Sequence, residues 1–232
     1  MSQRLALFDL DHTLLPLDSD YQWADFLART GRAGVDPEQA RRRNDELMEQ
    51  YNRGDLTAEK AVEFMLGLLA AHSPYDLAQW HEEFMEQVVR PAITPQAIRL
   101  VQDHLEAGDL CAIVTATNNF VTAPVARAFG VPTLISTDAQ YAHGRYTGRI
   151  QGTPSFKEGK VTRVNQWLAG MGRQLADFSE SFFYSDSVND VPLLEVVTRP
   201  VAANPSPALR QIAQTRGWQV LDLFDHLEDA KS

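Results

Sequence analysis

Two carboxylates directly follow the first apolar run of the chain. Residues 5–8, LALF, lead into Asp9, and Asp11 and Thr13 occupy the next alternate positions. A short apolar run of this kind predicts a buried strand that ends at the first acid. Because carboxylates repel one another and lose hydration when buried, a pair at the end of a core strand indicates a site with chemistry. The alternative is that both acids are turn residues that end the strand.

Further oxygen-bearing side chains follow two later strand-like runs. Thr115 follows residues 110–114, and Asp186 follows residues 182–185, with Asp190 four positions later. In an open α/β sheet, ligands bind at the carboxyl ends of the strands, so we expect these groups on one side of one sheet. A divalent cation would offset the repulsion among the carboxylates. Coordination by oxygen alone favours Mg2+ over Zn2+.

Lys160 adds an ammonium group to this acidic set. It lies at the start of a helical stretch that follows a predicted hairpin. A lysine beside a carboxylate-bound cation suits a doubly charged oxyanion shared between the two positive groups, and phosphate fits that description best. Phosphoryl transfer is catalysed mainly by positioning and charge neutralisation, which these groups supply. The expected partner is therefore a small phosphorylated molecule.

Strand-like and helical stretches alternate along most of the chain, which is typical of βαβ units and a mostly parallel sheet. Strand-like runs end at Phe8, Thr115, Ile135 and Tyr184, and a short one surrounds Val201. Helices are predicted between Pro95 and Gly108 and over 120–129, 160–169 and 190–197. Residues 139–151 predict a β-hairpin that turns at His143-Gly144.

Residues 16–91 break this alternation, because they carry helical patterns and no convincing strand. The W-x-x-F-L spacing at 23–27 marks an apolar helical face, and SPYD at 73–76 is a helix-capping pattern with proline in the first position. We therefore predict an α/β fold. Its core is a Rossmann-like, doubly wound parallel sheet formed by residues 1–15 and 92–232, with an all-helical cap at 16–91 inserted after the first strand.

Composition excludes several classes of partner and compartment. The formal net charge of −10 argues against general affinity for nucleic acid or an anionic membrane. Cys111 is the only cysteine of the 232 residues, which excludes a disulfide framework. The first apolar run is broken by Asp9 and does not resemble a signal peptide, and no segment is apolar for long enough to span a bilayer. We expect a cytoplasmic protein.

Four motifs resemble those of the haloacid dehalogenase-like superfamily and occur in the family's order. FDLDHTL at 8–14 resembles the D-x-D-x-T nucleophile motif, and IVT at 113–115 resembles the second motif, a Ser or Thr that ends a strand. Lys160 resembles the third motif, and SDSVND at 185–190 resembles the fourth, G-D-x-x-x-D, with Ser185 in place of Gly. Lys157 competes for the third motif. Lys160 is favoured because the helix runs on directly from it.

The helical insert is similar to the small cap of the phosphoserine phosphatase-like branch, subfamily IB. DSD at 18–20 and G-K-V-x-R-V-x-x-W at 159–167 resemble bacterial members that include histidinol-phosphate phosphatases. The resemblance implies a Mg2+-dependent phosphomonoesterase that acts on a small metabolite, such as L-histidinol phosphate or phosphoserine. Asp9 would attack phosphorus and form an aspartyl-phosphate. Asp11 would protonate the leaving alkoxide and then take a proton from water. Dehalogenases use no acid at that position, so Asp11 favours a phosphatase.

The resemblance also implies how the metal and the phosphate are held. The metal-ligand set would comprise the Asp9 carboxylate, the main-chain carbonyl of Asp11 and the Asp186 carboxylate. Asp190 would orient metal-bound water or the lysine of the third motif.

The hydroxyl of Thr115 and the backbone N–H of Ala116 would bind one phosphoryl oxygen, and Lys160 would neutralise another. Asn189 would assist substrate binding from outside this set.

Specificity is expected in the cap. Asp18 lies nine residues past Asp9, where phosphoserine phosphatases carry an acid that contacts the substrate's amino group. By this resemblance Asp18 would bind a substrate ammonium, with Asp20 assisting. The alternative is that Asp18 or Ser19 caps the first cap helix. No arginine is assigned to a substrate carboxylate; Arg53 and Arg90 are candidates, and without one the substrate would be an amino-alcohol phosphate.

Two other functions use the same residues. A phosphotransferase or mutase would form the same aspartyl-phosphate and pass the phosphoryl group to a hydroxyl, which a cap that excludes water would favour. A non-catalytic phosphate-binding module would keep only the fold. The complete set of acids, threonine and lysine argues against the second alternative.

Overall fold

The computed structural model describes residues 3–34, 36–53 and 58–224. The strands are β1 (Leu5–Phe8), β2 (Leu110–Asn118), β3 (Thr133–Ala142), β4 (Arg145–Gln151), β5 (Ser181–Ser185), β6 (Arg199–Ala203) and β7 (Gln219–Leu221). The helices before β2 are α1 (Ser19–Arg29), α2 (Pro37–Arg53), α3 (Ala58–Ala70), α4 (Pro74–Phe84), a π-helical segment η1 (Met85–Val89), α5 (Arg90–Ala92) and α6 (Pro95–Glu106). The later ones are α7 (Asn119–Ala128), α8 (Glu158–Gly170), α9 (Val191–Leu194) and α10 (Pro207–Arg216), with 3-10 turns η2 (Leu175–Asp177) and η3 (Val188–Asp190).

One sheet of the described residues has the strand order β4-β3-β2-β1-β5-β6-β7. All neighbours are parallel except β3 and β4, which form the antiparallel hairpin. Within β1, Phe8 pairs with Ile113 on one side and with Tyr184 on the other. The order reverses at β1, and such a switch point is where open α/β sheets bind ligands. The predicted α/β class with a doubly wound parallel sheet is confirmed.

The two faces of β1 belong to two different hydrophobic clusters. Ala6 and Phe8 pack with apolar residues of α1, α4, α6 and α7. Leu5 and Leu7 pack with apolar residues of α8, α9 and α10. This alternation follows from the two-residue period of a strand. It explains why β1 is apolar throughout, since a strand covered by helices on both faces has no solvent side.

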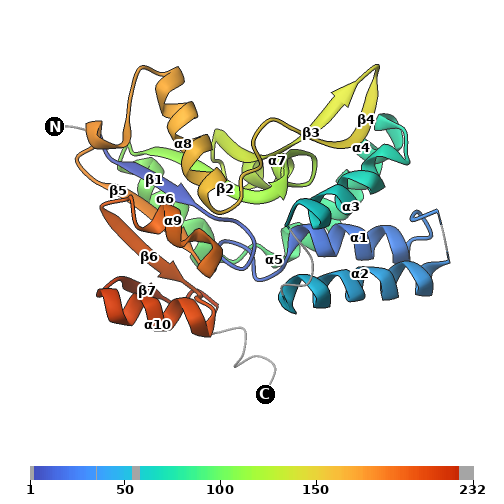
Figure 1. The fold of residues 1–232 in the computed structure, drawn as a ribbon, viewed down its shortest axis with the longest axis horizontal. Coiled ribbons are helices and arrows are strands. Elements are labelled where there is room, and N and C mark those ends of the chain that lie inside the picture. Colours follow the sequence, from blue (N-terminus) through green and yellow to red (C-terminus); the bar gives the residue numbers. More distant parts are fainter. Residues whose placement is uncertain (1–2, 35, 54–57, 225–232) are drawn as a thin grey trace.

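The helices of residues 16–91 lie beyond the carboxyl end of β1, and the β3–β4 hairpin projects beside them (Figure 1). Their starts obey the predicted capping rules: the side chain of Ser73 accepts from the N–H of Asp76, and Pro74 opens α4. Their buried residues, among them Trp23 and Leu69, join the same cluster as Phe8. The helices therefore pack continuously with one face of the sheet. The division into cap and core remains a prediction.

Four elements differ from the prediction. β3 does not end at Ile135 but continues to Ala142 as the first strand of the hairpin. β2 does not end at Thr115 but continues to Asn118, with a register shift against β3 after Val114. The helix predicted over 190–197 is a 3-10 turn followed by the short α9, with a proline in its first turn. β7 was not predicted, because three residues carry no recognisable period. The hairpin turn at His143-Gly144 is confirmed, with φ of 51° and 79° at the two residues.

Candidate active site

Lys160 joins two of the predicted acids. Its Nζ donates to Asp9 Oδ1 and to Asp190 Oδ2, both at 2.7 Å. Asp9 directly follows β1, Lys160 lies in the first turn of α8, and Asp190 ends η3. Lys160 is 2% exposed. Burial lowers its pKa, but the charges of Asp190 and Asp9 outweigh burial and the pKa is raised. Lys157 instead places its ammonium 5.3 Å from the ring centre of Phe156.

Thr13 links the first acid to Asp186. Its Oγ1 lies 3.2 Å from Asp9 Oδ2 and 3.2 Å from Asp186 Oδ1, and it accepts from the N–H of Asp186 at 3.1 Å. One hydroxyl proton can serve only one of the two carboxylates at a time. Thr13 therefore holds two acidic groups from different strand ends around a common point without neutralising either.

Negative charge accumulates at this point. Burial, then the charges of Asp9 and Asp190, raise the pKa of Asp186 to about 8. Burial also raises the pKa of Asp190 to about 6, although Lys160 opposes the rise. Ser185 donates from Oγ to Asp190 Oδ2 at 2.7 Å. The residue that replaces the family's glycine therefore binds an acid of the cluster.

Asp11 is held by a different set of groups. Its Oδ1 accepts from the N–H of Ser19 at 2.9 Å, and its Oδ2 accepts from Thr117 Oγ1 at 2.7 Å. Burial, followed by the charge of Asp18, raises its pKa to about 6. The carboxylate of Asp11 thus connects the start of α1 to the end of β2.

The predicted phosphate-binding residues lie where β2 becomes irregular. Thr115 is 1% exposed, and its Oγ1 accepts from the N–H of Thr117 at 3.2 Å. Ala116 is half-buried between them. Asn189 lies in η3, where its N–H donates to Ser187 Oγ at 3.2 Å. These placements bring Thr115 and Ala116 into the same strand end as the residue that binds Asp11.

The first turn of α1 carries the predicted specificity residues. Asp18 is the N-cap of α1 and accepts from the N–H of Tyr21 at 2.8 Å, as the capping alternative predicts. Asp20 Oδ1 accepts from Asn118 Nδ2 at 2.8 Å. Burial raises the pKa of both acids, and the charges of Asp18 and Asp11 add to the rise at Asp20. His12 opposes the rise at Asp18, but it does not outweigh burial, and Asp11, Asp18 and Asp20 make the region acidic.

One of the two arginine candidates has an acidic partner of its own. Arg90 pairs with Glu86 at 2.8 Å on an exposed surface. The side chain of Arg53 lies outside the described part of the chain.

Four residues hold the site together through contacts that sequence reasoning did not predict: Thr13, Ser19, Thr117 and Asn204. Asn204 follows β6, and its Nδ2 donates to the carbonyls of His12 and Thr13 at 3.2 and 3.0 Å. His12 and Asn204 both have a left-handed backbone, with φ of 57° and 47°. Asparagine is enriched in that conformation, but its type alone does not reveal a partner 191 residues away.

The cluster fits a magnesium ion. One ammonium contacts the carboxylates of Asp9 and Asp190, and burial together with the charges of these two acids raises the pKa of Asp186. Among the described residues, no three Asp, Glu, His or Cys side chains form a ready cage. Mg2+ does not need one, because it keeps several waters and binds through one or two carboxylates. The donors are all oxygen, as Mg2+ prefers.

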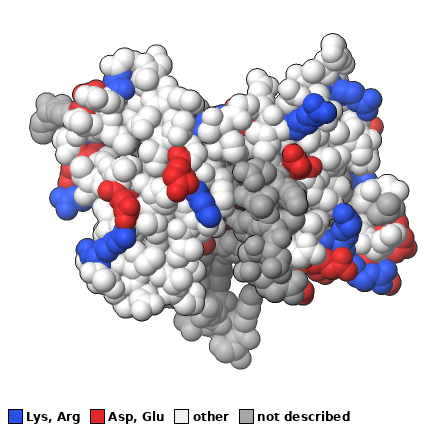
Figure 2. Space-filling model, in the orientation of Figure 1, with Lys and Arg blue, Asp and Glu red and all other residues white. Residues whose placement is uncertain are grey.

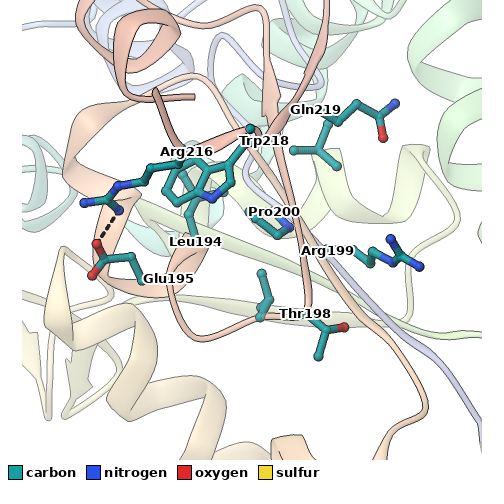
Figure 3. A pocket seen from close by; sticks show the side chains of 11 residues that line it. Leu194, Glu195, Thr198, Arg199, Pro200, Arg216, Trp218 and Gln219 are labelled. Atoms are coloured by element: carbon teal, nitrogen blue, oxygen red, sulfur yellow. Dashed lines mark hydrogen bonds and ion pairs between the residues drawn. The ribbon is translucent and has the colours of Figure 1, made fainter. Parts of the chain in front are cut away.

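A groove lies at the other end of the strands. It has a volume of about 920 Å³ and is lined by the first residues of β6 and β7 together with Glu195, Arg216 and Trp218 (Figure 3). Arg216 pairs with Glu195, and its guanidinium carbon lies 5.0 Å from the ring centre of Trp218. The groove is therefore separate from the acidic cluster, which lies at the carboxyl ends.

On the face shown in Figure 2, basic and acidic side chains lie beside one another. Arg163 pairs with Asp138 at 2.8 Å. Among the described residues, no helix is both long and apolar enough to cross a membrane.

The sequence model of haloacid dehalogenase-like hydrolases matches residues 6–195. The chain belongs to this family. It is 42% identical over 221 residues to a histidinol-phosphatase of Neisseria meningitidis serogroup C (strain 8013), covering 95% of this chain and 99% of that protein. It is 33% identical over 179 residues to a phosphoserine phosphatase of Mycobacterium tuberculosis (strain ATCC 25618 / H37Rv), covering 76% of this chain and 56% of that protein. The prediction that this family member is an enzyme, a phosphatase, is confirmed.

Solved structures agree with the fold. A Bordetella pertussis Tohama I protein of unknown function has a TM-score of 0.94 and 78% identity, and the match covers 97% of this chain and 100% of that one. A substrate-bound phosphoserine phosphatase complex has a TM-score of 0.68 and 18% identity, with 98% of each chain covered. The second likeness shows the α/β fold that surrounds the acidic cluster.

Proposed function

We propose that this phosphatase hydrolyses a small phosphomonoester with Mg2+ through an aspartyl-phosphate on Asp9. The contact of Lys160 with both Asp9 and Asp190 carries this proposal. It places a buried positive charge against the acid that follows the central strand, at the switch point of the sheet. A phosphoryl group that reaches Asp9 would meet this ammonium at once.

The reaction has two displacements at phosphorus. A carboxylate oxygen of Asp9 attacks phosphorus, the bond to the alkoxide breaks, and Asp11 gives its proton to the departing oxygen. Water then attacks phosphorus, Asp11 takes a proton from that water, and the bond to Asp9 breaks. Phosphate leaves, and both acids return to their starting states. Asp11 is available for both transfers because its carboxylate is held by neutral donors, Ser19 and Thr117.

The remaining residues bind and orient the phosphate. Thr115 Oγ1 and the N–H of Ala116 would hold one phosphoryl oxygen at the end of β2, and Lys160 would neutralise another. The carboxylates of Asp9 and Asp186 and the main-chain carbonyl of Asp11 would hold Mg2+. When bound, the ion supplies charge neutralisation for the phosphoryl oxygens.

Asp190 would orient Lys160, which it contacts, and Asn189 would assist binding from the turn between Asp186 and Asp190.

We assign the substrate's organic part to the helices of residues 16–91, acting as a cap over the carboxyl end of β1. The negative first turn of α1 suits an ammonium group, with Asp18 as the main contact and Asp20 assisting. Similarity along 99% of the Neisseria histidinol-phosphatase favours L-histidinol phosphate over phosphoserine. The enzyme would act on this free metabolite in the cytoplasm, without nucleic acid or membrane as a partner.

The proposal is tested by phosphate release from L-histidinol phosphate, phosphoserine and p-nitrophenyl phosphate, with Mg2+ or with EDTA. We expect release that requires Mg2+ and is lost in Asp9→Asn, with L-histidinol phosphate as the best substrate. Transfer of the phosphoryl group to an added alcohol instead of water would favour the phosphotransferase alternative. Phosphate and Mg2+ binding without turnover of any ester would favour a binding module.

The role of Asp18 has a separate test. Asp18→Asn retains a good N-cap residue, so α1 should still form. We expect kcat/KM to fall for amino-containing esters and to stay within about threefold for p-nitrophenyl phosphate, because only the former lose a charge-assisted contact. Equal losses on both kinds of ester would reduce Asp18 to a capping residue.

A further inference from the structure

The carboxylate of Asp11 accepts hydrogen bonds from two kinds of donor, a backbone amide and a hydroxyl. The Ser19 amide donates to Oδ1 at 2.9 Å, and the Thr117 hydroxyl lies 2.7 Å from Oδ2. A backbone amide can only donate, whereas a hydroxyl can donate or accept. Oδ1 must therefore stay an acceptor in every protonation state. Oδ2 is the oxygen that can carry a proton, because Thr117 tolerates it there.

The position of Thr117 is fixed by its neighbours along β2. Its N–H donates to Thr115 Oγ1 at 3.2 Å. The next residue, Asn118, donates to Asp20 at 2.8 Å and caps α7 by accepting from the N–H of Val121 at 3.1 Å. β2 is irregular between Val114 and Asn118, so the contact with Thr115, and not the period of the strand, fixes Thr117 there. Thr117 is 8% exposed. Its hydroxyl is thus held beside the acid by these neighbouring contacts.

We propose that Thr117 is a positioning residue for the acid–base step, holding Asp11 so that Oδ2 delivers and receives the proton. This inference rests on the proposed phosphatase reaction. Without the hydroxyl, no donor of β2 would fix Oδ2, and the carboxyl group would be held from the side of Ser19 alone. Proton transfer depends on the direction of the donor, so it should suffer more than phosphate binding or attack by Asp9.

Leaving groups of different basicity separate this role from a structural one. An alkoxide needs a proton as it departs, whereas p-nitrophenolate is stable as an anion. In Thr117→Val, we expect kcat/KM for alkyl phosphates to fall by roughly 10-fold or more, a part of the 10²–10⁴ that acid–base catalysis supplies. For p-nitrophenyl phosphate the fall should stay within about threefold, since the first displacement there needs little acid help.

The chain offers a matched control for the substitution. Thr122 is also buried, and its Oγ1 donates to the carbonyl of Asn118 at 2.8 Å. Thr122→Val removes a comparable hydroxyl at the same strand–helix junction without touching Asp11. It should change both esters equally. Thr117→Ser keeps a hydroxyl and should restore activity on alkyl phosphates, and this variant also serves if the valine variant folds poorly.

The outcomes separate this inference from the proposed function. We expect Thr117→Val to lower activity on alkyl phosphates in the original protein. If the same substitution causes no further loss in an Asp11→Asn background, Thr117 acts through Asp11. Equal losses on alkyl and p-nitrophenyl esters would overturn the inference and make Thr117 a phosphate contact or a structural residue. No loss would also overturn it. In either case phosphate release abolished by Asp9→Asn would leave the phosphatase reaction standing.

Discussion

At the scale of single residues, the ammonium of Lys160 offsets the repulsion between the buried carboxylates of Asp9 and Asp190. Its place beside the acids could be anticipated, because the predicted helix after the hairpin runs on directly from Lys160 and not from the competing Lys157. Thr117 could not be anticipated, since its contact with Asp11 joins residues 106 positions apart. A threonine near a strand end is common, and only the extended β2 shows what it binds.

The lysine assignment predicts a contrast between two variants. Lys160→Met leaves Asp9 and Asp190 buried without their cation, so we expect the free energy of unfolding to fall by about 3–5 kcal/mol and phosphate release to fall at least 100-fold. Lys157→Met should change neither much, because that ammonium lies over Phe156. Urea unfolding and initial rates on both proteins measure this. Similar effects in the two variants would place the catalytic cation elsewhere.

Ser185 predicts a smaller effect. Its hydroxyl is buried and donates to a carboxylate, so Ser185→Ala should lower the free energy of unfolding by about 1–3 kcal/mol. It should also lower kcat, because the Asp190 carboxylate would keep its contact with Lys160 but lose the hydrogen bond from Ser185 that orients it. Urea titrations with parallel rate measurements check both. An alanine variant as stable and active as the original protein would show that serine here is equivalent to the family's glycine.

At the scale of elements, a network of hydrogen-bonded side chains beneath the site holds β1, β2 and β5 together. Arg4 Nε donates to Asp109 Oδ1 at 2.8 Å, His104 Nδ1 lies 2.6 Å from Asp109 Oδ2, and His104 Nε2 lies 2.8 Å from the Tyr184 hydroxyl. Phe8 stacks on Tyr184 with ring centres 5.2 Å apart. This network therefore extends to Phe8, which precedes Asp9, and to Tyr184, which precedes the fourth motif.

The hydrogen bonds of Asp109 in this network predict how the free energy of unfolding changes at acid pH. Burial raises the pKa of Asp109, but the hydrogen bonds from Arg4 and His104 outweigh burial and the pKa is lowered. A carboxyl whose pKa is lower when folded stabilises the protein above its unfolded pKa, about 3.9, and loses this contribution as pH falls through the folded value.

Asp109→Asn should therefore reduce the fall in unfolding free energy below about pH 4. Urea titrations across the acid range measure this, with Asp103→Asn, an exposed acid on α6, as the control. An unchanged pH profile in Asp109→Asn would contradict the assignment.

Element boundaries show why the sequence predicts this fold only in part. The strands that carry Asp9 and Asp186 are apolar runs closed by an acid, so their ends were predictable. β2 passes its polar Thr115 and continues, because Thr117 binds Asp11 and Asn118 binds Asp20 of α1, two contacts that no local pattern reveals. Contacts of this kind follow from how distant segments pack, whereas strand existence follows from local periodicity.

At the scale of the whole molecule, the hairpin lies against the helices of residues 16–91. A Cβ added at Gly148 in β4 would lie 3.4 Å from Ala70 Cβ and 3.7 Å from Gly67 Cα in α3. The alternation of the sequence predicted both the hairpin and the helical insert. It gave no indication that they meet, because two glycines carry no pattern that identifies a partner.

Two glycine variants test this contact. Gly148 and Gly144 have nearly equal φ, 80° and 79°, so a leucine strains the backbone similarly at both, by about 1–2 kcal/mol. Nothing lies within 4 Å of a Cβ at Gly144. Gly148→Leu should therefore lower the free energy of unfolding by about 1–3 kcal/mol more than Gly144→Leu. Equal losses in urea unfolding would show that the hairpin and α3 do not depend on each other.

The central claim is that Asp9 carries the phosphoryl group between the two displacements. Rapid acid quenching during turnover of L-histidinol phosphate, followed by mass spectrometry of the digested protein, tests it most directly. The account predicts a phosphoryl adduct on the peptide that contains Asp9, present with Mg2+ and absent in Asp9→Asn. Phosphate release at an undiminished rate from Asp9→Asn, or an adduct on another residue, would contradict it.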